Sequence, residues 1–563
     1  MSRLAPLRRF ARGDPLAGCF EATPWPPCTL EAGPECFDST GIGQNGEPGS
    51  TTGETIPTGG VQTVTGAATT SEPDATTTTS ATTGAAENVP PAIESFSVDP
   101  DHLGEAGTAQ LHLVASEDAV EVRLSVGGKL LAELAPAAFP YPFEVLSGKF
   151  NGQHNFEAIA VDAEGLESAP ATATLTVNAP STGTEKCLFD ADKNDAGVVL
   201  SMVEGLVYAN DAIVAVGTRD TGAGPRLTVW KLGRDQCEVL PGWPKSGFGK
   251  LGNEMSGARA LTLDADGNMI VAGFVLDGIT PRRYLAMLNS GGSVLWDDLG
   301  PLGEEIAGVA VAPKPQAAVF AVGWRRSKVD PSPTDAAIWI YKLDGTPFPP
   351  DYLAAPFTPD EEPDEFNDFS EKLRAVVFEP ITGHALAVGE REFKGDINKS
   401  YSRTFLVRLH PLAGRVGTPW TSNGAAFNHD AALALSTCGD ELVAAGWRRD
   451  LVGDDPQPVL QWFKHDGTFT EMQPIAVTAA QFSGVACDRE GKIVSAGVRD
   501  LGQIDAIALA TPRSGGAPTW YEKGTSGEDE AAAVSCDGRG FCAWGGFRTE
   551  AGKRHAVVRV HHP

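Results

Sequence analysis

The sequence predicts an all-β protein, with a seven-bladed β-propeller preceded by a β-sandwich and a disordered N-terminal tether. Three observations support this fold class: a glycine phrase repeated seven times within 186–563, period-two apolar alternation within 89–179, and a Thr/Gly/Ser-rich segment at 38–88. The three regions differ in composition and periodicity, so each is expected to form a separate part. A length of 563 residues agrees with several parts, because single cores stop growing at about 250–300 residues.

The chain is strongly acidic. Its 44 Lys and Arg residues stand against 73 Asp and Glu residues, which gives a formal net charge of −29. Binding to nucleic acid needs clustered basic residues that replace phosphate counterions. We therefore expect no nucleic-acid partner.

Residues 1–37 are predicted to be an export or anchor region. Basic residues precede Leu16-Ala17-Gly18-Cys19, a tetrapeptide that resembles a bacterial lipobox. The resemblance implies an extracytoplasmic protein, either secreted or an outer-membrane lipoprotein with its lipid on Cys19. The apolar segment that normally precedes such a box is absent here, which leaves a different translation start or a chance match as alternatives. No stretch reaches the roughly 18–20 apolar residues of a membrane helix, so a lipid would be the only membrane attachment.

The chain has nine cysteines, and none has the spacing of a zinc site. If Cys19 carries a lipid, the eight others are an even set that could form disulfides in an oxidising compartment. The candidates for disulfides are Cys28, Cys36, Cys536 and Cys542. The last two flank a short hairpin, and we expect them to be bonded to each other.

The next two regions lie between the anchor and the repeats. Residues 38–88 contain almost nothing apolar to bury and are predicted to be a disordered linker. Residues 89–179 then alternate apolar and polar positions, as at Leu111 and Leu113, at Val120 to Val126, and at Leu175 and Val177. That pattern predicts a β-sandwich. The segment Phe156 to Gly165, with the strand that follows it, resembles the last two strands of bacterial immunoglobulin-like domains, which implies a spacer module.

A repeated phrase decides the fold of residues 186–563. An apolar strand ends in a glycine, and an arginine follows two places later in six of the seven copies. The glycines are Gly217, Gly273, Gly323, Gly389, Gly446, Gly497 and Gly546, at spacings of 56, 50, 66, 57, 51 and 49 residues. Four strands in about 50 residues, repeated seven times, are typical of the blades of a propeller.

One repeat carries a family resemblance. Its second strand reads Asp266-Gly267-Asn268-Met269-Ile270-Val271-Ala272-Gly273, and Trp296 follows in the fourth strand. This pattern resembles the bacterial SBBP and delta-60 β-propeller repeats. The resemblance implies the fold and leaves the function open, because one fold hosts many functions. The last repeat contains only three strands, so we expect the segment that begins at Cys187 to supply its fourth strand and close the ring.

The arginines of the phrase are the strongest candidates for a shared site. The second strand ends on the same side of a blade as the first strand begins, and acidic residues precede several first strands. We therefore expect arginines and acids to surround one mouth of the central channel. Either they pair and connect the blades, or they form a ligand site. The residues are Arg219, Arg325, Arg391, Arg448, Arg499, Arg548, Glu204, Glu254, Glu305, Glu371, Asp430 and Asp529.

No catalytic or metal-binding motif stands out, and we expect no metal and no cofactor. The sequence favours a monomeric extracytoplasmic binding or scaffold protein that presents its propeller to a protein or glycan at the cell surface. The alternative is a secreted propeller hydrolase or lyase acting on polysaccharide. Such an enzyme needs two carboxyl groups at one mouth of the channel, one of them with a raised pKa.

Overall fold

The computed structural model describes residues 89–145, 150–192, 197–209, 212–252, 254–326, 334–348, 370–394, 400–410, 414–422, 429–450, 454–522 and 528–563. The predicted anchor region and tether, with Cys19, Cys28 and Cys36, lie outside these residues. The described chain is all-β apart from two single-turn 3₁₀ helices, η2 (Pro136–Ala138) and η4 (Gly249–Leu251). Within this part of the chain, no helix is long and apolar enough to cross a membrane.

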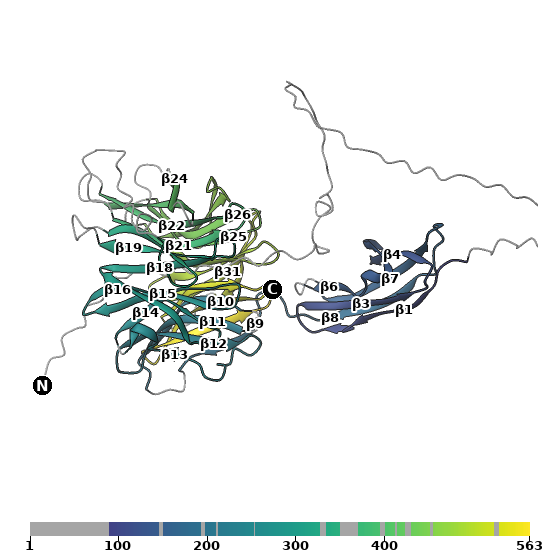
Figure 1. The fold of residues 1–563 in the computed structure, drawn as a ribbon, viewed down its shortest axis with the longest axis horizontal. Helices are drawn as coiled ribbons and strands as arrows, with labels where there is room; N and C mark the ends of the chain where they lie inside the picture. The colour runs from purple at the N-terminus through teal and green to yellow at the C-terminus, as the bar shows by residue number, and fades with distance from the viewer. Residues whose placement is uncertain are drawn as a thin grey trace, which may run out of the picture.

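Residues 93–177 form a unit of two sheets (Figure 1). The first sheet has the order β1-β3-β6, with β1 at Ile93–Asp99, β3 at Gly107–Ala115 and β6 at Tyr141–Val145. The second has the order β2-β8-β7-β4-β5, and its strands are β2 (His102–Leu103), β4 (Ala119–Val126), β5 (Lys129–Leu134), β7 (Gly152–Asp162) and β8 (Ala171–Val177).

Residues from both sheets share one hydrophobic cluster. Leu111, Leu124 and Leu175 are fully buried in it, as their alternation predicts. The prediction was wrong for Val120, which is 55% exposed. The cause is a register shift in the pairing of β4 with β7 between Ala119 and Glu121, which turns Val120 away from the core.

The repeats form a β-propeller made of antiparallel sheets (Figure 1). The first strands of the repeats are β10 (Leu200–Tyr208), β14 (Ser256–Leu263), β18 (Glu304–Ala312), β21 (Ser370–Glu379), β25 (His429–Cys438), β29 (Ala480–Cys487) and β33 (Asp529–Cys536). Each contacts the next in this order, and β33 contacts β10. The first strands therefore make a closed inner ring.

The other strands extend outward from that ring. Second strands are β11 (Ala212–Asp220), β15 (Met269–Asp277), β19 (Ala318–Arg326), β22 (His384–Lys394), β26 (Glu441–Arg449), β30 (Ile493–Asp500) and β34 (Cys542–Glu550). Third strands are β12 (Pro225–Gly233), β16 (Thr280–Leu288), β20 (Thr334–Lys342), β23 (Ser400–His410), β27 (Gln457–Lys464), β31 (Ile504–Thr511) and β35 (Lys553–His561). Fourth strands are β13 (Lys245–Ser246), β17 (Val294–Leu302), β24 (Gly414–Thr421), β28 (Phe469–Pro474) and β32 (Thr519–Glu522).

The ring closes with a strand from the start of the propeller. β9 (Glu185–Asp190) pairs antiparallel with β35, with Phe189 opposite Val558. This pairing confirms the predicted source of the closing strand. It also covers the edge that β35 would otherwise expose.

A bulge explains the repeated glycine. In every repeat, the pairing of the first strand with the second skips one residue of the first strand. A Cβ atom on the repeated glycine would lie 1.7–2.1 Å from a backbone oxygen at that bulge, as for Gly389 beside the carbonyl of Lys372. Only glycine can occupy this position, because any side chain would overlap the backbone.

The propeller has two faces that differ in what covers them. We call the side with the first-to-second and third-to-fourth strand turns the linker face. The N-terminal unit contacts this face, where Glu105 pairs with Lys186 at 2.9 Å and Glu144 pairs with Arg489. The opposite side, with the second-to-third strand turns and the connections between repeats, is the crossover face. The phrase arginines lie at the crossover face because the second strands end there.

Candidate functional site

The inner charged cluster lies on the first strands and on the second strand β22, toward the crossover face. Its members are Glu204, Arg259, Glu305, Arg374, Glu390 and Glu530. Glu204, Arg259 and Arg374 are the skipped residues of the bulges in β10, β14 and β21. The skipped residues of the other first strands are Ala307, Leu433, Ser483 and Ala532. A bulge redirects the side chain of the skipped residue. The bulge occurs at the same place in every repeat, but the skipped side chain is charged in some repeats and small or apolar in others.

Arg259 connects three neighbouring sheets. Its Nη1 lies 3.2 Å from Oε1 of Glu204 on β10, and its Nε donates to Oε1 of Glu305 on β18 at 2.5 Å. Its guanidinium also stacks over the ring of Phe274, 4.7 Å from the centroid. The two carboxylates raise the pKa of Arg259 against the effect of burial, so this cation stays charged.

The cluster has more acid than base. Besides the two carboxylates bound to Arg259, it contains Glu390, which pairs with Arg374, and Glu530 on β33. Burial raises the pKa of Glu204 to about 7; Arg259 opposes this shift, and the neighbouring Glu305 and Glu530 add to it. Burial also raises the pKa of Glu530. The Oε2 atom of Glu204 is buried and has no hydrogen-bond partner in the described residues.

This arrangement can hold a proton near neutral pH or interact with a cation. Among the described residues, no three His, Cys, Asp or Glu side chains are grouped closely enough to hold a metal ion. Glu204 and Glu305 both pair with Arg259. The two carboxyl groups are therefore not arranged as a general acid and a general base on either side of a substrate. The chemistry of the cluster is therefore that of ion pairing.

The phrase arginines all have acidic partners, most of them within their own sheet. Arg391 pairs with Glu371 directly across β21 and β22. Arg325 pairs with Asp335 and Arg499 with Asp505, both at 3.8 Å, and Arg448 pairs with Asp450 at 2.9 Å. Arg219 pairs with Asp192 at 2.7 Å and Arg548 with Asp190 at 2.5 Å, where β9 closes the ring. Their side chains are 14–33% exposed.

The predicted acids are distributed over different environments. Glu204 and Glu305 bind Arg259, and Glu371 pairs with Arg391. Asp430 is buried and accepts hydrogen bonds from the Ser422 hydroxyl, and Asp529 is buried and accepts from the Thr549 amide. Glu254 is exposed and lies outside the cluster.

The strand register explains which predicted acids lie opposite an arginine of the phrase. Glu371, Asp430 and Asp529 do so, opposite Arg391, Arg448 and Arg548. The residue opposite each arginine lies three places before the bulge, which makes it Glu304 for Arg325 and Ser201 for Arg219. The predicted Glu305 lies one residue beyond Glu304, and the predicted Glu204 is itself the bulge residue of β10. Arg374, Glu390 and Glu530 were missed entirely, as was Arg259. Aligning the repeats on the bulge would have placed Arg259 and Arg374 beside Glu204.

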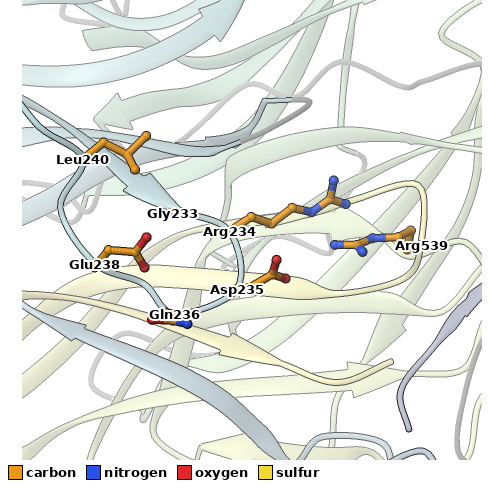
Figure 2. A pocket seen from close by; sticks show the side chains of 7 residues that line it. All are labelled: Gly233, Arg234, Asp235, Gln236, Glu238, Leu240 and Arg539. Carbon is orange, nitrogen blue, oxygen red and sulfur yellow. The ribbon is translucent and has the colours of Figure 1, made fainter. Parts of the chain in front are cut away.

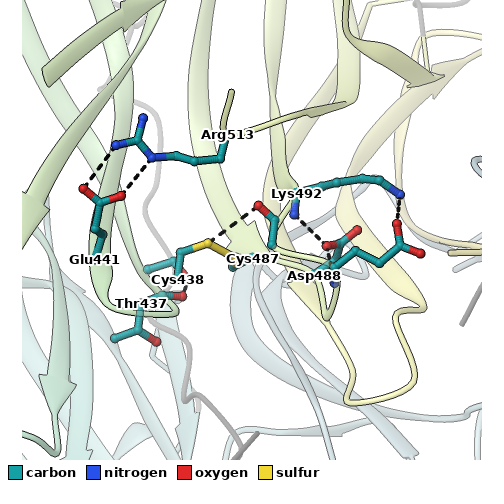
Figure 3. Close-up of a disulfide and its surroundings, with 10 residues drawn as sticks. Thr437, Cys438, Glu441, Cys487, Asp488, Lys492 and Arg513 are labelled. Carbon is teal, nitrogen blue, oxygen red and sulfur yellow. Dashed lines mark hydrogen bonds and ion pairs between the residues drawn. A yellow bond between two sulfur atoms is a disulfide. The ribbon is translucent and has the colours of Figure 1, made fainter. Parts of the chain in front are cut away.

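The described residues contain three disulfides, and all three lie at the linker face. Cys536 bonds to Cys542 across the β33–β34 hairpin, with Cα atoms 4.0 Å apart. Cys438 bonds to Cys487, which joins the ends of the neighbouring first strands β25 and β29 (Figure 3). Arg513 reinforces the same junction through hydrogen bonds of 2.8 and 3.1 Å to Glu441. Cys187 on the closing strand bonds to Cys237 after β12.

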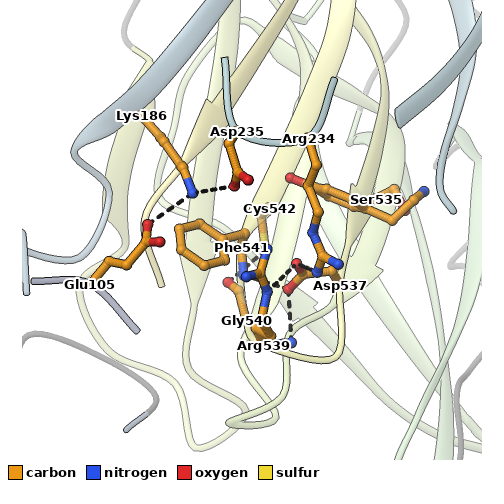
Figure 4. A network of polar contacts seen from close by, with 11 residues as sticks. Glu105, Lys186, Arg234, Asp235, Ser535, Asp537, Arg539, Gly540, Phe541 and Cys542 are labelled. Carbon is orange, nitrogen blue, oxygen red and sulfur yellow. Dashed lines mark hydrogen bonds and ion pairs between the residues drawn. The ribbon is translucent and has the colours of Figure 1, made fainter. Parts of the chain in front are cut away.

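A pocket of about 530 Å³ also opens at the linker face, beside the Cys237 loop (Figure 2). Arg234, Arg539, Asp235 and Glu238 line it. Three of its four charged side chains are already compensated, because Arg234 and Arg539 both bind Asp537 and Asp235 binds Lys186 (Figure 4). This network holds the start of β9 and the N-terminal unit against the propeller, which makes the pocket a poor candidate for a ligand site.

Comparison with known proteins gives no family. No protein-family model matches the chain, and no curated protein matches it. Among solved structures, the Pan2 WD40 domain of Neurospora crassa is similar at 10% identity and a TM-score of 0.42, covering 68% of this chain and 95% of that one. The β-propeller domain of the Trilobed protease from Pyrococcus furiosus is similar at 10% identity and a TM-score of 0.36, covering 64% and 95%. A Dyadobacter fermentans protein of unknown function is similar at 12% identity and a TM-score of 0.38, covering 65% and 99%.

Proposed function

We propose that this chain is an extracytoplasmic binding or scaffold protein whose propeller presents its crossover face to a protein or glycan at the cell surface. In this proposal the propeller has seven blades, the last completed by β9. The unit at 93–177 is an immunoglobulin-like spacer, and Cys19 carries a lipid where the mature chain is anchored.

The observation that supports the proposal is that the two faces of the propeller differ: the N-terminal unit contacts one of them, and the charged cluster lies toward the other. The linker face is occupied by the N-terminal unit, which contacts it through Glu105 and Glu144. The inner charged cluster lies toward the crossover face, and the bulge positions hold five residue types in the seven repeats. Side chains that differ between otherwise similar repeats are suited to recognising one asymmetric partner.

The disulfides support an oxidising compartment. Six of the nine cysteines are bonded in pairs in the described chain, and disulfides persist mainly outside the cytoplasm. Mass spectrometry of the mature N-terminus tests the anchor, with a lipid-modified Cys19 as the expected result. An intact Met1 on protein from the cytosol would contradict both the anchor and the export.

The hydrolase or lyase alternative is less favoured. The raised pKa of Glu204 meets one of its requirements. However, Glu204 and Glu305 share one arginine between them, whereas a polysaccharide-cleaving pair must face a substrate.

A photo-crosslinking experiment tests the binding role. A photoreactive residue replaces Leu501, which is 62% exposed in the β30–β31 turn on the crossover face, or Ile381, which is 70% exposed on the linker face. With native envelope extract, we expect a crosslinked partner from position 501 and none from position 381. Crosslinking from position 381 alone, or from neither position, would refute the assignment.

A further inference from the structure

The first and last repeats of the propeller meet at a seam that contains one short strand. β9 has six residues and pairs with β35 of the last repeat, starting with Glu185 opposite His561. The N-terminal unit joins the propeller at this end of β9. Tension that enters through the N-terminal unit would therefore pull β9 away from β35 one residue pair at a time, starting at Glu185.

A loop of the first repeat holds this strand in place (Figure 4). We call residues 234–237, which follow β12, the clasp loop. Asp235 of this loop pairs with Lys186 of β9 at 2.9 Å. Cys237 of the same loop is bonded to Cys187, the next residue of β9. The first repeat therefore holds the closing strand by an ion pair and by a covalent bond.

The clasp loop also binds the last repeat directly. Arg234 pairs with Asp537, which lies in the β33–β34 turn and whose side chain is 3% exposed. Arg539 of the same turn lies 3.5 Å from the same carboxylate. Salt screens buried ion pairs less than exposed ones. One loop of the first repeat thus connects to both β9 and the last repeat.

The register of β9 explains how Lys186 reaches the clasp loop. The pairing of β9 with β35 skips Lys186, which lies between Glu185 and Cys187. Such a bulge turns the skipped side chain away from the regular ladder. The Lys186 ammonium lies 2.9 Å from Asp235 of the clasp loop and 2.9 Å from Glu105 of the N-terminal unit. One side chain at the seam therefore contacts both parts.

The disulfide lies near the end at which separation of the strands would begin. Before Cys187, the chain is held to the last repeat by two backbone hydrogen bonds with His562, each of 2.9 Å, and by the pairing of Glu185. After it, residues 188–190 pair with β35. A pull that reaches Cys187 passes through the sulfur atoms to Cys237 and then to β12, which pairs with β11 along its whole length. The covalent bond therefore carries a load that would otherwise separate residues 188–190 from β35.

We propose that the clasp loop and the Cys187–Cys237 bond form a mechanical latch, which transfers tension from the N-terminal unit to the first repeat and keeps the ring closed. This inference goes beyond the proposed binding function, because the latch acts whatever the propeller binds. In the proposed anchored arrangement, a load on a bound partner would pass through the linker to β9. The latch would prevent that load from opening the seam.

Force spectroscopy on the full chain tests the latch. One handle is attached to the N-terminal end of the chain and the other to a bio-orthogonal side chain at position 501 on the crossover face. The proteins compared are the unmodified chain, Cys187→Ser/Cys237→Ser, and Cys438→Ser/Cys487→Ser as the matched control. The control also loses a disulfide between neighbouring repeats, but it keeps the clasp loop and its bond to β9.

We expect an early extension event in Cys187→Ser/Cys237→Ser alone. It corresponds to the release of residues 185–199, which would lengthen the chain by up to roughly 50 Å. In the unmodified chain and in the control, β9 should stay paired until the repeats themselves unfold. An early event of this size in all three proteins, or in none of them, would overturn the proposal.

Amide exchange without load distinguishes a latch from a general stabiliser. In Cys187→Ser/Cys237→Ser, the amides of residues 187–190 and 557–560 should exchange about tenfold faster, whereas those of β26 and β27 should change by less than about twofold. The control should leave the exchange at the seam unchanged. A uniform increase over all repeats would mean that the disulfide stabilises the whole propeller, and the latch would be refuted.

A second variant keeps the test valid if Cys187→Ser/Cys237→Ser does not fold. A chain in which the other four bonded cysteines are replaced by serine keeps Cys187–Cys237 as the one disulfide among the described residues. Dithiothreitol can then reduce that bond in the folded protein. Reduction should produce the early event and the faster exchange at the seam, and an unchanged response would contradict the latch. None of these outcomes changes the crosslinking expected from the crossover face, so the latch and the proposed function fail separately.

Discussion

His561 is predicted to make the stability of the propeller depend on pH. This side chain is 2% exposed at the end of β35 and stacks on Tyr521. Its Nε2 accepts a hydrogen bond from Trp544 at 3.1 Å, and its Nδ1 lies 3.0 Å from the Gly183 carbonyl. Both contacts fit a neutral ring with the proton on Nδ1. Protonating Nε2 would place two N–H donors against each other.

The magnitude follows from the shift in pKa. Burial lowers the pKa of His561 from 6.5 to about 4, opposed by its hydrogen bond to Gly183 and assisted by Arg559 and His562. The folded pKa lies below the unfolded one, so the unfolded chain binds a proton first and stability falls as pH drops from 6.5 toward 4. Between pH 7 and pH 5 this costs about 2 kcal/mol of unfolding free energy.

Glu204 acts in the opposite direction over the same interval. Its folded pKa is raised from 4.5 to about 7, so the folded chain binds a proton first and stability rises as pH falls from 7 toward 4.5. Between pH 7 and pH 5 the gain is also about 2 kcal/mol. The two effects nearly cancel in the unmodified protein, and its stability alone would conceal both.

Matched variants separate them. We expect His561→Gln, which removes the titration and keeps a donor and an acceptor, to gain about 2 kcal/mol relative to the unmodified chain between pH 7 and pH 5. Glu204→Gln should lose about the same amount over that interval. Denaturant unfolding of the disulfide-bonded chain at both pH values measures these differences, with exposed His112→Gln as the control. Parallel pH dependence of His561→Gln and the unmodified chain would refute the reasoning.

Three further predictions concern the stability of the propeller and the closure of its ring. Gly389→Ala should lower the unfolding free energy by about 3 kcal/mol, because the new Cβ would overlap the bulge carbonyl; Gly104→Ala, with nothing within 4 Å, is the thermal-melt control and should change little. Arg391→Ala should cost about 3–5 kcal/mol by leaving the buried Glu371 without its cation, and an unchanged melt would contradict that ion pair. Replacing residues 185–190 with a Gly/Ser segment should speed amide exchange in β35, whose outer edge they pair; unchanged protection would mean that β9 does not close the ring.

The sequence predicted the strands of the propeller well because each repeat encodes the same local geometry. The repeated glycine has a direct physical cause at the bulge, so its spacing tracked the sheets closely. The closing strand could also be deduced, because a three-stranded last repeat leaves an edge that needs a partner. The environment of the acidic residues could not be deduced from the sequence, because one skipped residue in a strand changes which side chains are neighbours.

The disulfides show a similar limit. Cys438, Cys487 and Cys536 occupy the same position, at the end of three successive first strands. Cys487 therefore has an equivalent cysteine on either side. The extra Cys542, directly opposite Cys536 in the β33–β34 register, bonds to Cys536 and leaves Cys487 with Cys438. The spacing along the chain, nearly one repeat in both directions, could not distinguish these pairings.

The contrast between repeated and varied positions bears on where function resides. The glycine occurs in every repeat and the arginine in six of seven, and both are explained by what the sheets share, a bulge and an ion pair within or beside each sheet. The bulge residue itself is free to vary and does, from Glu204 and Arg259 to Ala307 and Leu433. If shared positions maintain the strand geometry, an asymmetric partner must be recognised at varied positions that reach solvent. Among the bulge residues only Arg259 does so, because the other six are buried. The bulge residues of β10 and β14 therefore give the inner ring a charge asymmetry that the shared positions do not have.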